Sequence, residues 1–161
     1  MTEHTLEIQN KETDLLASRW SRLWAALIDC LIAVATTIPL MSYLDVWALA
    51  FEGHIPIDVT IKLAVLSWLL FFLIHGYFLK EKGQTVGKMI LGIAIVTLDG
   101  HKPEFIPLVL KRYLPMMIIG YIPLIGQYLS ITEVLFIFRK DKRCIHDLIA
   151  GTKVINANRA D

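Results

Sequence analysis

The sequence predicts an all-α membrane protein with four transmembrane helices arranged as two hairpins. It also predicts short cytoplasmic amphipathic segments and a small two-stranded ribbon. Composition gives the class, because 55% of the 161 residues are hydrophobic, only 19% are charged, and the apolar residues are concentrated in blocks. The positions of the Lys and Arg residues give the number of membrane crossings. A water-soluble domain of this size would not be so apolar.

The first two apolar blocks form the first predicted hairpin. They span about residues 20–44 and 59–79, and each is long enough to cross a hydrocarbon core of ~30 Å. The connection between them carries three carboxylates and no Lys or Arg, which places it outside. The preceding residues 1–19 are mixed and polar, without the basic start of a signal peptide. We expect them to form a cytoplasmic tail.

The last apolar region, residues 106–138, allows either one long helix or two short helices over about 106–121 and 125–138. Charge decides between the two. If the N-terminus is inside, a hairpin leaves fifteen of the sixteen Lys and Arg residues on the inner side or its boundary, and only Lys62 outside. A single crossing would export six of them. We therefore predict a plasma or inner membrane protein with a transmembrane domain over 20–155, a C-terminal tail over 156–161 and both termini in the cytoplasm.

Two segments that follow the predicted hairpins share one layout. GKMILGIAIV starts at Gly87 and HDLIAGTKVI starts at His146, and each has a short apolar turn, a glycine and a strand-like run. The chain then consists of two copies of hairpin, surface helix and strand, and the two strands pair as the ribbon. Side by side, Lys88 falls opposite Asp147, which makes these residues a candidate pair. The alternative is a chance similarity of short apolar segments.

The same stretches carry a family resemblance. Arg22 and Asp29 in the first helix, GQTVGKMILGIAIVTLDG after the second and RCIHDLIAGTKVI near the end together resemble the RDD family of small membrane proteins, named for one arginine and two aspartates. The resemblance covers the chain from Arg22 to Ile155, and its motif residues are Arg22, Asp29 and Asp147. It implies a role in transport, which for some members includes sodium/proton antiport.

Asp29 raises a physical question, because a carboxylate inside a membrane helix is costly unless it is paired. We expect Arg112, or its neighbour Lys111, to be that partner. Glu133 is a second intramembrane carboxylate. Asp29, Glu133 and Arg112 are therefore the candidate ion- or proton-binding residues, since two neighbouring carboxylates can exchange a proton for a cation. The alternative is a static ion pair that fixes helix packing.

The other two motif residues suggest more local roles. Arg22 lies two helical turns, or ~10 Å, from Asp29 and cannot pair with it tightly, so we expect Arg22 to reach the inner headgroups and anchor the helix. Asp147 opens an amphipathic turn, where it can cap backbone N–H groups or pair with Lys88.

The function predicted from these features is a small transporter, such as a Na⁺/H⁺ antiporter that uses its intramembrane carboxylates. The alternative is a non-transporting scaffold or accessory subunit that binds lipid or a partner protein. The expected partners are the bilayer, Na⁺ or H⁺, anionic lipid headgroups at the basic inner face, and further copies of the chain, because four short helices enclose little room. Cys30 and Cys144 are expected to be unpaired thiols. Catalytic motifs, metal-ligand spacing, cofactor fingerprints and basic nucleic-acid-binding domains are absent from the sequence, so we expect no enzyme, cofactor, metal or nucleic-acid partner.

Overall fold

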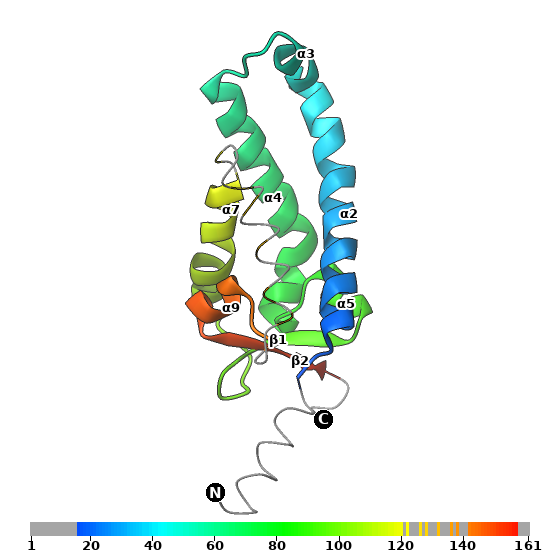
Figure 1. Cartoon of the computed structure of the whole chain (residues 1–161), viewed down its shortest axis with the longest axis vertical. Coiled ribbons are helices and arrows are strands. Elements are labelled where there is room, and N and C mark those ends of the chain that lie inside the picture. Colours follow the sequence, from blue (N-terminus) through cyan, green and yellow to red (C-terminus); the bar gives the residue numbers. More distant parts are fainter. Residues whose placement is uncertain are drawn as a thin grey trace, which may run out of the picture.

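The computed structural model is mostly helical, and two of its helices are long and apolar enough to cross a membrane (Figure 1). It describes residues 16–120 and 142–157, together with residues 122, 126, 128, 132, 136 and 138. The predicted helix over 125–138 lies largely outside these residues, and Glu133 lies outside them entirely. Of the predicted tails, residues 1–15 and 158–161 also lie outside them.

The two long helices form an antiparallel hairpin. They are α2 (Arg19–Tyr43) and α4 (Ile57–Lys82), and the short α3 (Val46–Phe51) lies in the connection at the far end from the sheet (Figure 1). The Ser18 side chain starts α2 by accepting a hydrogen bond from the Ser21 N–H at 2.9 Å. Few residues in the middle of either helix are buried, and each helix has a row of exposed apolar side chains, as suits contact with lipid. The bounds agree with the predicted 20–44 and 59–79.

The next helical stretch is continuous but not uniform. It consists of α6 (Phe105–Leu108), the π-helical turn η1 (Val109–Tyr113) and α7 (Leu114–Gly120). Pro115 has no N–H to donate to the carbonyl four residues before it, and the wider turn ends two residues before this proline. The wider turn carries Lys111 and Arg112, and Arg112 is buried.

Two strands close one end of the molecule. The strand β1 (Ile93–Thr97) follows the short helix α5 (Val86–Ile90), and β2 (Thr152–Asn156) follows the short helix α9 (Ile145–Ala150). The strands are antiparallel, and the centre of the register pairs Ile95 with Val154. Both helices end at a glycine with positive φ, Gly92 at 62° and Gly151 at 64°.

The pairing supports the internal repeat. Ile95 and Val154 are each the third residue after their glycine, so the pairing is symmetric about them. Both strands also have the same alternation of buried and half-buried residues. The strand pairing is therefore symmetric about its centre, and each strand follows a short helix and a glycine.

The N-terminal segment joins this sheet at its edge. Leu16 forms a bridge with Ile155, and the Ala17 N–H donates to the Val154 carbonyl at 3.0 Å. The buried apolar cluster lies directly above, between the sheet and the lower ends of the helices. Its members are Ala17, Ala25, Leu79, Ile93, Ile95, Leu108 and Val154. The sheet end is thus packed, whereas the upper parts of α2 and α4 are not.

Candidate functional site

The first cluster of charged groups surrounds Asp29, about midway along α2. Its carboxylate accepts hydrogen bonds from the Thr85 hydroxyl at 2.5 Å and from the Gly87 N–H at 2.8 Å. Thr85 is the residue that caps the N-terminal end of α5. The intramembrane carboxylate is therefore held by the start of a short helix from outside its own hairpin, where free N–H groups favour negative charge.

Gly87 is what allows α5 to come so close to α2. A Cβ atom added at Gly87 would lie 2.3 Å from the Ala25 carbonyl oxygen and 2.8 Å from an Asp29 carboxylate oxygen. Neither distance is possible for a side chain, so only glycine fits here. The close approach is thus a property of this residue rather than of the helix as a whole.

Two more titratable groups complete the Asp29 cluster. The Lys88 ammonium and the His75 Nδ1 atom each lie 3.9 Å from the Asp29 carboxylate. His75 Nδ1 accepts a hydrogen bond from the Val86 N–H at 3.2 Å. That bond assigns the ring proton of a neutral His75 to Nε2.

Lys88 is poised to lose its proton near physiological pH. Its burial, reinforced by the positive charge of Arg112, lowers the pKa of Lys88 to about 8, although Asp29 favours the charged form. Its side chain is only 17% exposed. The Asp29–Lys88 pair can therefore change its protonation state, unlike an ordinary lysine ion pair.

The second cluster is centred on Asp147, which is completely buried in α9. Its carboxylate accepts hydrogen bonds from the guanidinium groups of Arg112 and Arg22, the latter at 2.5 Å. It also accepts from the Thr152 hydroxyl and the Cys144 N–H, both at 3.1 Å. Asp147 thus joins α2, η1 and the start of its own helix in one contact.

These four donors fill the carboxylate, since two of them reach each oxygen. Burial alone would favour the neutral acid, but Arg112, His146 and Arg22 outweigh it and hold the pKa of Asp147 well below its usual range. Asp147 therefore stays ionised at any pH at which the protein is handled. The cluster is a fixed ion-pair network rather than a site that exchanges protons.

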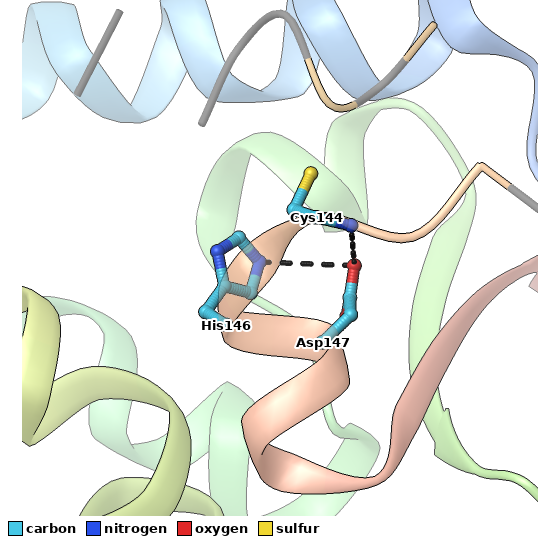
Figure 2. A group of neighbouring side chains, drawn as sticks. All are labelled: Cys144, His146 and Asp147. Atoms are coloured by element: carbon cyan, nitrogen blue, oxygen red, sulfur yellow. Dashed lines mark hydrogen bonds and ion pairs between the residues drawn. The ribbon is translucent and has the colours of Figure 1, made fainter. Parts of the chain in front are cut away.

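Figure 2 shows Cys144, His146 and Asp147 together at the start of α9. Their ligand atoms all lie within 4.8 Å of one another, which is close enough to surround a metal ion. However, Arg22 donates to both the Cys144 sulfur, at 3.8 Å, and the Asp147 carboxylate. A metal cation would have to displace a guanidinium group that is already paired. The arrangement therefore fits an arginine clamp and not a metal centre.

The two clusters correct the predicted pairing of charges. Arg112 pairs with Asp147 and not with Asp29, and Lys88 lies beside Asp29 and not beside Asp147 in a direct ion pair. Arg22 does not extend to the headgroups, because it is buried against Asp147. Asp147 does cap the start of α9, as predicted, through the Cys144 N–H. Cys30 and Cys144 are thiols that form no disulfide.

Sequence reasoning missed three residues of the Asp29 cluster. Thr85 caps the start of α5, and Gly87 lies where α5 contacts α2. The sequence QTVGK indicates the cap at Thr85. His75 was also missed, because its partner Val86 lies in another helix. The second carboxylate of the predicted ion site, Glu133, lies outside the described residues.

A hairpin of two long, apolar and largely unburied helices is typical of an integral membrane protein. The RDD family model matches residues 16–151, which include both clusters. The chain is also 35% identical to the uncharacterized protein YckC of Bacillus subtilis (strain 168) over 142 residues, which cover 88% of this chain and 85% of that protein. The chain therefore belongs to the RDD family. No solved structure matches it.

Proposed function

We propose that this protein is a small cation/proton antiporter, with Na⁺ as the first cation to test, and that Asp29 and Lys88 form its exchange site. The observation that carries the proposal is the contact between Asp29 and Lys88, a half-buried pair in which the cation is a lysine close to deprotonation. An intramembrane carboxylate with a titratable partner is a common basis for proton coupling.

The exchange follows from competition for one carboxylate. When Lys88 is protonated, its ammonium group balances the charge of Asp29. When Lys88 releases its proton, a Na⁺ ion takes the place of the ammonium group beside the Asp29 oxygens, and the Thr85 hydroxyl oxygen is close enough to join them. One proton leaves for each Na⁺ that binds, so the net charge of the site is unchanged.

The arginine clamp supports this role from a neighbouring position. Arg112 and Arg22 both disfavour the charged form of Lys88, and Asp147 partly offsets them. The family motif residues thus divide into two groups: Asp29 carries the exchange, while Arg22 and Asp147 hold the structure and set the field around Lys88.

Replacing Asp29 by Asn is expected to abolish exchange, because the amide keeps the shape of the side chain but cannot balance a cation. The measurement is the pH change inside sealed proteoliposomes after an external Na⁺ pulse, at equal verified incorporation. The matched control is Asp58→Asn, which removes an exposed carboxylate of α4 that pairs with the exposed Lys62. Proton movement in Asp29→Asn equal to that in wild type would refute the proposal. Absence of movement in every variant with Na⁺, Li⁺ and K⁺ would favour the scaffold or accessory role.

The same assay gives the direction of the pH dependence. Below pH 8 Lys88 keeps its proton and holds Asp29, so exchange should rise as the pH increases through about 8, the value to which the pKa of Lys88 is lowered. Lys88→Arg keeps the charge but cannot release a proton, and it should be inactive across this range. Lys62→Arg is the control, since Lys62 is exposed.

We further propose that the chain crosses the membrane four times with both termini in the cytoplasm, so that the sheet lies on the cytoplasmic side. The distribution of Lys and Arg supports this, as do the two apolar helices and the two-fold pairing of the strands. A cytoplasm-specific reporter fused after Asp161 should be active, and one inserted at Gly53 in the α3–α4 connection should be silent. The opposite pattern, or a silent C-terminal fusion, would overturn the arrangement.

A further inference from the structure

A cavity of about 290 Å³ lies between α2, α4 and α7. Its lining is mostly apolar but includes five residues with polar side-chain atoms. These are Thr36, Thr37, Ser67, Trp68 and His75. The cavity is open on one side, and its volume is ample for water molecules.

The cavity begins where the Asp29 cluster ends. His75 belongs to both, since it lines the cavity and its Nδ1 lies 3.9 Å from Asp29. On α2 the lining residues follow Asp29 by three to eight positions, which places them ~5–12 Å farther from the sheet along the helix. On the antiparallel α4 they run from His75 back to Ser67, in the same direction. The cavity thus continues from the charged cluster towards the α3 end of the molecule.

Two polar groups of the lining residues need partners. The Ser67 hydroxyl and the Trp68 indole N–H are buried and have no hydrogen-bond partner among the described residues. In the apolar part of a membrane an unsatisfied donor is costly, and lipid chains cannot supply an acceptor. Both residues line the cavity, so water within it is the partner that a side-chain rotation towards the cavity would reach.

We propose that this cavity is hydrated and forms the part of the ion path that leads from the Asp29 cluster to the side of the membrane opposite the sheet, with His75 at the junction. The ligands it takes are water and a monovalent cation. The inference rests on the proposed antiport for its role as a path, whereas hydration of the cavity stands on the geometry alone.

Hydration is tested by the reaction of cysteines with a membrane-impermeant cationic methanethiosulfonate, since a thiol must ionise to react and does so only where water reaches it. In a Cys30→Ser background, Ser67→Cys places a thiol in the cavity, and Val65→Cys places one on the lipid-exposed face of the same helix. When the reagent is added from the side opposite the sheet, we expect Ser67→Cys to react at least tenfold faster than Val65→Cys. The readout is the mass of the intact protein in sealed proteoliposomes, and the parent variant gives the contribution of Cys144.

A second pair of variants on α2 makes the test independent of whether Ser67→Cys folds. Thr37→Cys lies in the cavity and Val34→Cys faces outward. Equal rates within both pairs, or labelling in neither, would overturn hydration of the cavity. Labelling of a cavity cysteine must also stop Na⁺-driven proton movement in a variant that exchanges before labelling; continued exchange would overturn the role as a path. Labelling does not require transport, so a failure of the antiport itself would be recognised separately in the Asp29→Asn assay.

Discussion

Replacing Asp147 by Asn should nearly abolish the folded protein. The substitution leaves the guanidinium groups of Arg22 and Arg112 buried against each other without a counter-charge. Removing one partner of a buried ion pair costs about 3–5 kcal/mol. The measurement is the fraction of monodisperse protein left after a temperature ramp in detergent, together with its abundance in membranes.

Two controls distinguish the loss of the ion pairs from a general sensitivity of the sheet end to substitution. Asp99→Asn changes an exposed carboxylate in the turn after β1 and should be neutral. The triple variant Arg22→Met, Arg112→Met, Asp147→Leu removes the whole network, and apolar replacement of a buried ion network is often neutral or stabilising. It should recover most of the loss, apart from about 1 kcal/mol for the helix cap. A triple variant as unstable as Asp147→Asn would show that the ion pairs are not the reason.

Gly87→Ala is the second change with a large expected effect. The added methyl group would overlap the Ala25 carbonyl and the Asp29 carboxylate, so α5 must move away from α2. That movement breaks the hydrogen bond from the Gly87 N–H to Asp29 and carries Lys88 away from the carboxylate. We expect a loss of stability of about 1–3 kcal/mol, typical of overpacking. We also expect loss of Na⁺-driven proton movement in proteoliposomes as complete as for Asp29→Asn.

The matched control is Gly76→Ala on α4. There the nearest atom to a new Cβ is the Phe72 Cβ at 3.9 Å, an ordinary contact. Alanine is the better helix former by about 1 kcal/mol, so Gly76→Ala should be neutral or stabilising and should keep its exchange activity. If Gly87→Ala behaved like Gly76→Ala, the tight α2–α5 contact would not matter for the site.

The elements of the first hairpin were predictable because each depends on local sequence. The apolar length of α2 and α4 and the glycines that end α5 and α9 are visible without any knowledge of the tertiary structure. It was also predictable from the sequence that Asp29 needs polar or charged partners. The partners themselves were not predictable, because two of them, Thr85 and Gly87, reach Asp29 only when α5 folds back onto α2.

The error over Lys88 and Asp147 has a simple geometric reason. These residues occupy equivalent positions in the two repeats, four residues before Gly92 and Gly151. Corresponding residues of the two segments each face their own surroundings and need not touch each other. Lys88 meets the carboxylate of a membrane helix, Asp29, whereas Asp147 meets a cation of the corresponding stretch, Arg112. Each site thus pairs a charged residue of a short helix with an oppositely charged residue of a longer helical stretch, and the signs are reversed between the two sites.

The pairing of the N-terminal segment with β2 has a consequence for how the protein is made. Leu16 and Ala17 leave the ribosome long before Val154 and Ile155, their partners in the sheet. Arg22 is likewise synthesised before its partner Asp147, with 124 residues between them. A nascent chain that has inserted its first hairpin therefore still carries an uncompensated arginine and an open strand edge. The sheet and the buried ion pairs can therefore form only after α9 and β2 have been synthesised.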